Sequence, residues 1–147
     1  YGHSGSDVAT PGLATAMTLR SALISVRTIG AGESVGYGGT FRASRESRIA
    51  TVPIGYADGY FRALSNRGVV LVRGTRCPVA GRVSMDLLGV DVTDDASAIV
   101  GDEVVLLGKQ QGAEVTVEEL ARAAGTVPYE IFTNVSRRVP RVYLGGD

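Results

Sequence analysis

The sequence predicts a mainly β domain, barrel-like or Greek-key in arrangement, with one clear short helix at about residues 117–124. Three observations favour this class. Apolar and polar residues alternate over many short stretches, glycines separate these stretches, and only one stretch has strong helical periodicity. With 147 residues, of which 44% are hydrophobic, the chain has enough apolar material for one globular domain with a core.

The first strand is expected to begin near Ala16. Met17 and Leu19 share one face of this strand, but beyond Ser21 the apolar positions change phase, which predicts a bulge or bend near Ser21. Further strands are expected at residues 48–54, 68–73, 77–85, 87–92, 103–107, 130–135 and 141–144.

The helix has recognisable boundaries. Thr116 and Glu119 have the spacing of a capping box, an apolar stripe follows at helical spacing, and Gly125 ends the pattern. A short helical turn is also expected within residues 57–64, because that segment lacks strand alternation.

Residues 1–14 are small and contain Gly, Ser and Pro, so we expect a linker there and the β domain at 15–147. The chain does not begin with Met, which suggests a piece excised from a longer protein.

Composition argues against several classes of function. Fifteen basic residues balance fifteen acidic ones, so no net charge attracts nucleic acid or an anionic membrane. The sequence has neither an apolar run long enough for a membrane span nor a signal-peptide pattern. Cys77 and His3 are the only residues of their kinds, so we expect no internal disulfide, no metal site and no Ser/His/Asp set. A lone cysteine suits a reducing compartment, and we expect a cytoplasmic location.

Lys109 is the only lysine and therefore the only amine side chain that can form a Schiff base. Its surroundings, residues 108–112 (GKQQG), are expected to form a polar turn.

Two tyrosines lie in glycine-rich loops nineteen residues apart. Tyr37 lies in 35–40 (VGYGGT) and Tyr56 lies in 53–59 (PIGYADG), and a third segment, 82–86 (RVSMD), follows them. Glycine next to tyrosine allows turn geometry and leaves the phenol on a connecting segment, where burial does not explain it. The three loops therefore suggest one site.

These loops resemble the C-terminal domain of the alanine racemases, which depend on pyridoxal phosphate. Six segments match in the family's order: 1–2, 16–21, the loop at Tyr37, 54–59, 81–86, and 129–130 followed by 138–141. The resemblance implies interconversion of L- and D-alanine, which supplies D-alanine for peptidoglycan. It also implies that the cofactor's lysine lies in an N-terminal α/β barrel outside this chain, so that the chain alone is inactive and does not bind the cofactor.

The resemblance further implies a homodimer, in which this domain leans over the barrel of the partner subunit. Tyr37 would be the acid/base on the L-alanine face, and the lysine would serve the D-alanine face. A free phenol has a pKa of about 10. To act as a base near neutrality, it needs a pKa that is lower by about two units. Apart from Arg42, no neighbour of Tyr37 in sequence is suited to stabilise the phenolate anion. We therefore expect the groups that stabilise this anion to lie on the barrel.

The remaining roles are also implied by the resemblance. Tyr56 and Met85 would form the substrate pocket, with Asp86 as the substrate-binding residue that follows Met85. Arg62 and Arg82 would line the corridor to the active site, and Tyr129 would bind the cofactor phosphate. Val127 would line the same corridor. Each residue also has an ordinary structural explanation: a packed ring, core filling, or a solvated charge. For Tyr129 that explanation is a place on a strand beside Ile131.

Two alternatives stay open. The chain is part of a racemase or decarboxylase of another amino acid, such as serine, or it is a non-enzymatic β domain whose exposed tyrosines and arginines form an interaction surface.

Overall fold

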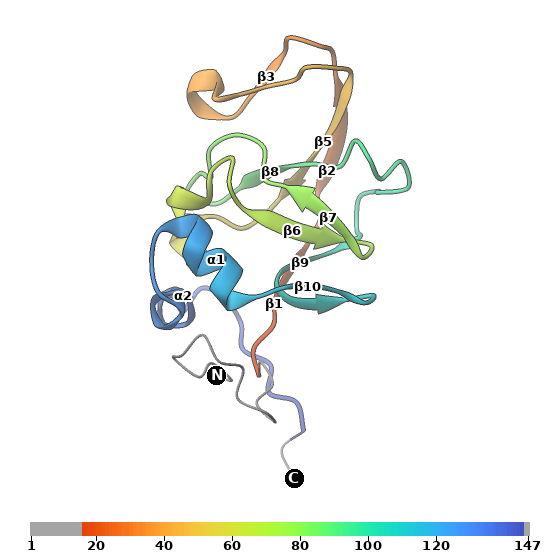
Figure 1. The fold of residues 1–147 in the computed structure, drawn as a ribbon. Helices are drawn as coiled ribbons and strands as arrows, with labels where there is room; N and C mark the ends of the chain where they lie inside the picture. The colour runs from red at the N-terminus through yellow and green to blue at the C-terminus, as the bar shows by residue number, and fades with distance from the viewer. Residues whose placement is uncertain (1–15, 146–147) are drawn as a thin grey trace.

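The computed structural model describes residues 16–145, and the chain there folds into antiparallel sheets with two α-helices at one end (Figure 1). The larger sheet has the order β1-β9-β6-β7, with β10 paired to β9. Its strands are β1 (Leu19–Ala22), β6 (Val69–Val72), β7 (Thr75–Pro78), β9 (Glu103–Gln110) and β10 (Ala113–Val115).

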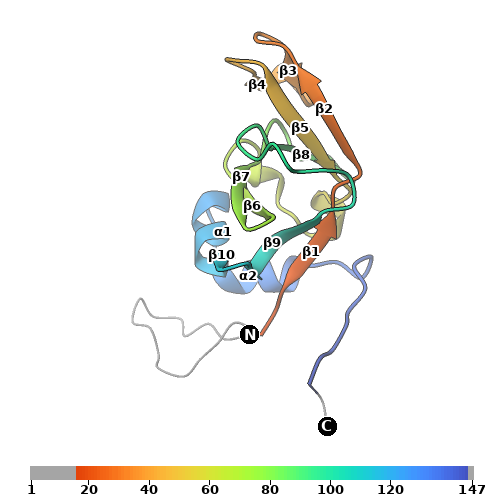
Figure 2. The same ribbon diagram turned by 90° about the vertical axis from the view of Figure 1, so that its right-hand side faces the viewer.

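The second sheet has the order β2-β5-β8, and a two-stranded hairpin, β3-β4, extends beyond it. The bounds of these strands are β2 (Ser25–Ile29), β3 (Ser34–Val35), β4 (Phe41–Arg42), β5 (Ser47–Val52) and β8 (Leu88–Asp91). Figure 2 shows the hairpin at one end of the molecule and both helices at the opposite end.

The two sheets meet on both sides, which makes the arrangement barrel-like. On one side the chain passes directly from β1 to β2 through Leu23 and Ile24. On the other side an isolated bridge pairs Val79, just after β7, with Val90 of β8. The core lies between the sheets and continues under the helices, where β9 buries the whole run Val104–Leu107. The prediction of a mainly β fold is confirmed, and the sheets are antiparallel.

The register irregularity lies close to its predicted position but not at it. Leu19 pairs with Leu107, and the next residue, Arg20, pairs with Val105, so the additional residue belongs to β9. Leu23 is buried and Ile24 is exposed, which reverses the phase expected after Ser21.

The helical predictions are confirmed. Helix α1 spans Val117–Ala124, Thr116 Oγ1 accepts a hydrogen bond from the amide of Glu119 at 3.1 Å, and Gly125 takes a left-handed conformation. The carboxylate of Glu119 binds Arg76. The expected turn after Tyr56 consists of two 3-10 turns, η2 (Tyr56–Asp58) and η3 (Arg62–Leu64).

Two predicted strands are wrong, and a third, 77–85, is wrong beyond Pro78, where β7 ends and only an isolated bridge at Val79 follows. Residues 130–135 belong largely to helix α2 (Pro128–Asn134), because Pro128 occupies the favoured first turn of a helix and the buried positions Ile131, Phe132 and Val135 follow helical spacing rather than alternation. Residues 141–144 are exposed and form no regular structure, since no strand pairs with them in the described part of the chain.

Lys109 was also wrongly placed in a turn, because it lies within β9 and pairs with Glu114 of β10. The turn is confined to Gln111 and Gly112, whose φ angles of 48° and 84° match the hairpin turn that fits the twist of two antiparallel strands.

Some predictions lie outside the described residues, namely the linker at 1–14 and His3. Within residues 16–145, neither helix is long and apolar enough to cross a bilayer.

The buried thiol of Cys77 generates a prediction about stability at high pH. Burial raises the pKa of Cys77 to about 11, against 9.0 for the free thiol. The unfolded thiol therefore loses its proton first, and the free energy of unfolding decreases between pH 9 and 11, by an amount on the order of 1 kcal/mol. Urea unfolding at several pH values measures this slope.

Cys77→Ala is the comparison, because burial also raises the pKa of Tyr60 and adds to the slope of both proteins. We expect a shallower decrease for Cys77→Ala. Equal slopes in the two proteins would show that the thiol contributes nothing.

Candidate functional site

The structure brings six of the seven predicted site residues together around one open cleft of about 430 Å³. We call it the tyrosine cleft. It is lined by Tyr37, Tyr56, Arg62, Arg82, Val83, Ser84, Met85, Asp86 and Leu87. Tyr129, the seventh predicted residue, does not line it.

Tyr37 projects from a turn between β3 and β4. Gly36 and Gly38 have φ angles of 79° and 71°, which side chains rarely adopt, so these glycines allow the chain to reverse around the tyrosine. The side chain of Tyr37 is 74% exposed, and its hydroxyl makes no hydrogen bond to any of residues 16–145. The phenol is thus presented outward from a well-defined turn.

The Tyr37 turn lies directly on the segment that carries Arg82. A methyl group on Gly81 would lie 2.7 Å from the carbonyl oxygen of Val35, and one on Gly36 would lie 3.1 Å from the amide nitrogen of Arg82. Backbone packs against backbone here because both residues are glycines. A methyl group on Gly38 would lie 3.8 Å from Cζ of Arg82, so the guanidinium lies alongside the turn.

Arg42, the cationic neighbour of Tyr37 in sequence, is engaged elsewhere. Its guanidinium donates a hydrogen bond to the carbonyl of Gly32, in the turn between β2 and β3. The cations that line the tyrosine cleft together with Tyr37 are Arg62 and Arg82.

The Tyr56 loop is held by main-chain hydrogen bonds to the segment that carries Met85. The amide of Tyr56 donates to the carbonyl of Ser84, and the amide of Ala57 donates to the carbonyl of Met85, both at 3.0 Å. A methyl group on Gly55 would lie 2.2 Å from the Ser84 oxygen and 2.5 Å from the Met85 oxygen. Only glycine at position 55 permits this approach.

Met85 and Asp86 form the tip of a tight turn closed by Ser84. The amide of Ser84 donates to the carbonyl of Leu87 at 2.9 Å, and the amide of Leu87 donates to the hydroxyl of Ser84 at 3.1 Å. The turn leaves the side chain of Met85 51% exposed. The amide of Met85 has no hydrogen-bond partner in the described part of the chain.

Arg138 pairs with two carboxylates behind the cleft, a role that the sequence did not indicate. Its Nη2 lies 2.6 Å from Asp86 and its Nε lies 3.3 Å from Asp58. The hydrogen bond with Asp86 raises the pKa of Arg138, and burial opposes that change only in part. The sequence placed Arg138 in a matched segment but offered no signal of its partners.

Asn66 is a second residue that the sequence did not identify. Its side chain donates to the hydroxyl of Thr40 at 3.1 Å and accepts from the amide of Gly81 at 2.7 Å. It therefore joins the Tyr37 turn to the Arg82 segment. Asn66 has a φ of 57°, and asparagine's tolerance of positive φ was the available signal.

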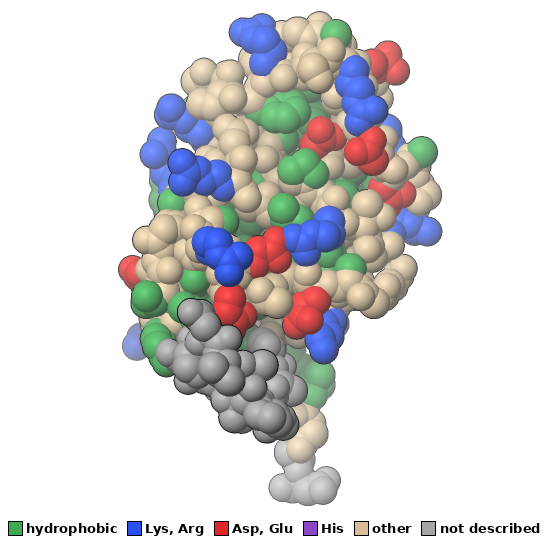
Figure 3. Space-filling model, viewed as in Figure 1, with side chains coloured by type: hydrophobic (Ala, Val, Ile, Leu, Met, Phe, Trp, Pro, Cys, Tyr) green, Lys and Arg blue, Asp and Glu red, His purple; other side chains and the backbone are tan. Residues whose placement is uncertain are grey.

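Arg62 reaches the cleft from η3, which is tied to the same segment. The hydroxyl of Ser65 donates to the carbonyl of Arg62 at 2.5 Å and accepts from the amide of Val83 at 2.9 Å. Figure 3 shows basic side chains gathered along one edge of the molecule, where Figure 1 places the segment 56–64 and the Tyr37 turn.

Tyr129 lies on helix α2 and not on a strand, so the strand explanation for it is wrong. Its side chain and that of Val127 are each more than half exposed. The end of α2 contacts the Tyr56 loop, since the amide of Ser136 donates to the carbonyl of Asp58 at 3.0 Å.

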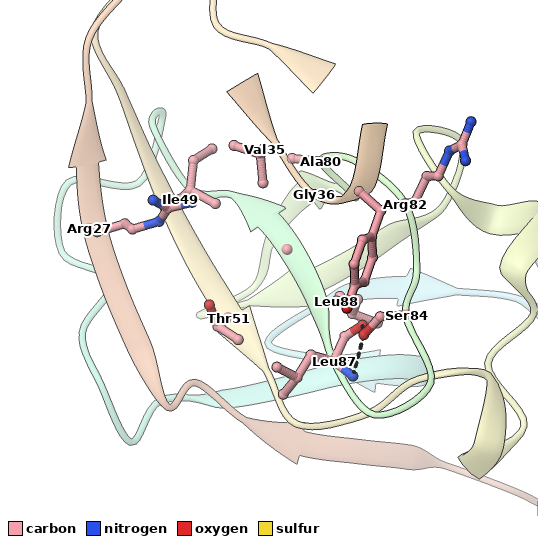
Figure 4. Close-up of a pocket in the computed structure, with 12 residues that line it drawn as sticks. Arg27, Val35, Gly36, Ile49, Thr51, Ala80, Arg82, Ser84, Leu87 and Leu88 are labelled. Carbon is pink, nitrogen blue, oxygen red and sulfur yellow. Dashed lines mark hydrogen bonds between the residues drawn. The ribbon is translucent and has the colours of Figure 1, made fainter. Parts of the chain in front are cut away.

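A second pocket, of about 360 Å³, shares Tyr37 with the tyrosine cleft and lies over the sheet β2-β5-β8 (Figure 4). Val35, Ile49, Ala80 and Leu88 provide an apolar lining, and the Arg82 guanidinium is directed away from it. Tyr37 thus lines both the tyrosine cleft and an apolar recess.

Lys109 lies apart from the tyrosine cleft. It lines a different hollow, together with Arg20, Glu103 and residues 139, 140 and 142–144. Among the described residues no cluster of His, Cys, Asp and Glu is arranged to hold a metal ion.

Comparison with known proteins matches residues 16–143 to the family described as alanine racemase, C-terminal domain. An alanine racemase from Sorangium cellulosum (strain So ce56) is 51% identical over 147 residues, which cover 97% of this chain and 39% of that relative. The chain thus spans less than half the length of this curated relative.

Two solved structures show the same fold. Alanine racemase from the D-cycloserine producer Streptomyces lavendulae gives a TM-score of 0.92 at 48% identity, covering 99% of this chain and 39% of that one. Alanine racemase from Bartonella henselae, with covalently bound pyridoxal phosphate, gives a TM-score of 0.80 at 38% identity, covering 86% of this chain and 34% of that one.

The contact at Gly55 generates a prediction about loop packing. Gly55→Ala forces the Tyr56 loop away from the Met85 segment, because the new methyl group meets backbone atoms that side-chain rotation cannot relieve. We expect a loss of about 2 kcal/mol in the free energy of unfolding, typical of overpacking. Urea unfolding measures the loss, and hydrogen exchange at the amides of Tyr56 and Ala57 reports the separation.

Gly30→Ala is the matched control, because its methyl group would make an ordinary contact of 3.5 Å with a Glu33 side-chain oxygen. Stability changes of equal size in the two variants would contradict the steric argument.

Proposed function

The chain belongs to the alanine racemase C-terminal domain family, and on this premise we propose that it contributes the tyrosine acid/base and part of the substrate pocket to an enzyme that interconverts L- and D-alanine. The observation that carries the proposal is the exposed phenol of Tyr37, which projects into a cleft shared with two arginines and Met85.

Racemisation requires two acid/base groups, one on each face of the α-carbon. Tyr37 removes the α-proton of L-alanine and returns a proton to that face in the reverse reaction. Its hydroxyl is free of competing hydrogen bonds within residues 16–145, so it can approach a substrate held outside this chain. The group that serves the D-alanine face comes from elsewhere in the longer enzyme.

The cleft suits the carboxylate of a small amino acid. Arg62 and Arg82 supply positive charge, and the unpaired amide of Met85 can donate a hydrogen bond. Tyr56 narrows the cleft from the other side with a rigid ring and a polar tip. Asp86 contributes to the wall, while its carboxylate binds Arg138.

Pyridoxal phosphate supplies the electron sink for the carbanion when bound. The tyrosine cleft contains no lysine that can form its Schiff base, and Lys109 lines a different hollow, so the cofactor is held mainly by an N-terminal domain. Tyr129 is exposed on α2 and carries a phenolic donor suited to the cofactor's phosphate.

We further propose a homodimer in the cytoplasm, in which the cleft faces the N-terminal barrel of the partner subunit. A contact surface here is supported by three exposed large side chains, those of Tyr37, Met85 and Leu87. Clusters of exposed large apolar side chains usually mark surfaces that bind another protein. The buried free thiol of Cys77 fits a reducing compartment.

A domain exchange tests the proposed function. We expect alanine racemase activity, measured with purified protein, when this chain replaces the corresponding C-terminal domain of the Sorangium cellulosum enzyme, because the two are 51% identical. A folded exchange protein that holds pyridoxal phosphate and racemises serine faster than alanine favours the alternative substrate. One that racemises no amino acid contradicts the proposal.

Tyr37→Phe in the exchange protein tests the acid/base role. We expect kcat/KM to decrease by about 10² to 10⁴ in both directions, since the overall equilibrium between enantiomers cannot change. The asymmetry shows in solvent deuterium exchange, because α-proton exchange is lost from L-alanine and retained from D-alanine.

Tyr143→Phe is the control, since Tyr143 is exposed and lies outside the tyrosine cleft. Loss of exchange from both enantiomers in Tyr37→Phe would show that the phenol acts on something other than the L face.

A further inference from the structure

Arg138 connects the two loops that bring Tyr56 and Met85 to the cleft. Its side chain leaves the segment after α2 and reaches Asp58 in the first loop at 3.3 Å and Asp86 in the second at 2.6 Å. Asp58 and Asp86 are 28 residues apart in sequence, so a shared arginine is a tertiary link between the two loops.

The Asp58 end of this link is well anchored. Asp58 is buried, and its second carboxylate oxygen accepts a hydrogen bond from the amide of Gly55 at 2.9 Å. That bond closes the 3-10 turn that begins at Tyr56. A change at Asp58 is therefore transmitted to Tyr56.

The Asp86 end is the more exposed partner, since more than half of its side chain is accessible to solvent. Asp86 follows Met85 at the tip of the Ser84 turn, which is closed by hydrogen bonds between Ser84 and Leu87 and is joined to the Tyr56 loop through the carbonyls of Ser84 and Met85. Among residues 16–145 only Arg138 forms an ion pair with the carboxylate of Asp86, so Arg138 sets the position of the turn beyond the Met85 carbonyl.

The base of Arg138 is itself fixed to the backbone. Its amide donates to the hydroxyl of Ser136 at 3.2 Å, and the amide of Ser136 donates to the carbonyl of Asp58 at 3.0 Å. Arg141 braces the same segment by donating to the carbonyls of Val135 and Val139, at 2.8 and 2.7 Å. The side chain of Arg138 therefore extends from a rigid support.

We propose that Arg138 is a positioning residue that sets the Met85 turn against the Tyr56 loop and cancels the charge of Asp86, so that the cleft presents Arg62 and Arg82 to a carboxylate. The positional part rests on the fold alone. The charge part rests on the proposed function, because it requires a substrate with a carboxylate.

The charges around the cleft support the second part. Its charged lining residues are Arg62, Arg82 and Asp86. Without Arg138, the carboxylate of Asp86 stands uncompensated at the rim and opposes an incoming carboxylate. With Arg138 in place, the two arginines remain as the effective charges.

Hydrogen exchange on the 147-residue chain tests the positional part. We expect Arg138→Ala to accelerate exchange at the amides of Tyr56 and Ala57 about threefold to tenfold, because local opening of the two loops becomes easier. Arg137→Ala is the matched control, since Arg137 is exposed and makes no ion pair within the described residues. Equal protection in the two variants overturns the positional role.

Kinetics of the exchange protein test the charge part. We expect Arg138→Ala to raise KM for alanine about threefold to fivefold, the range of a partly exposed ion pair, with a smaller change in kcat. Adding Asp86→Asn to Arg138→Ala should lower KM again. The single variant Arg138→Lys should keep KM close to that of the unmodified exchange protein. A KM that stays high in the double variant overturns the charge role.

The two arms separate the possible failures. If the domain-exchange protein without further substitutions has no racemase activity, the proposed function is contradicted. The hydrogen-exchange measurement on the 147-residue chain still decides the positional role. An active exchange protein whose KM does not respond to Arg138→Ala contradicts this inference alone.

Discussion

The site depends on backbone contacts that only glycine permits. Gly55 lies against the carbonyls of Ser84 and Met85, and Gly81 lies against the carbonyl of Val35, at distances where any side chain would collide. Because main chain meets main chain, hydrogen bonds and steric limits fix the closest approach of the loops at these glycines, and side-chain ion pairs act on the parts of the turns that lie beyond them. The backbones of the three loops therefore form one rigid unit although they are distant in sequence.

This rigid unit explains how a side chain as exposed as Tyr37 can still be well positioned. The phenol has no partner within residues 16–145, but the turn beneath it is held by Asn66 and by the Arg82 segment. Sites that carry out proton transfer need their groups held closely in place. Here the backbone supplies the precision, and the side chain remains available to a substrate held by another domain.

The charged side chains form a second layer around this unit. Arg138 joins the carboxylates of Asp58 and Asp86 behind the cleft, and Arg62 and Arg82 face into it. Surface ion pairs contribute little to stability, so the value of such an arrangement lies in orientation and in the sign of the local charge. The same arginine thus affects both the position of Met85 and the charge of the cleft.

The sequence by itself determined the mainly β class and helix α1 with its caps, because periodicity and capping residues are local signals, and its resemblance to a known family indicated six residues that line the cleft. It did not determine that residues 130–135 lie largely within a helix, since a short apolar segment has no clear period. Only the tertiary structure decided the partners of Arg138, Arg42 and Asn66. These contacts join segments 10 to 80 residues apart, and no local pattern records which carboxylate or carbonyl folding brings within reach.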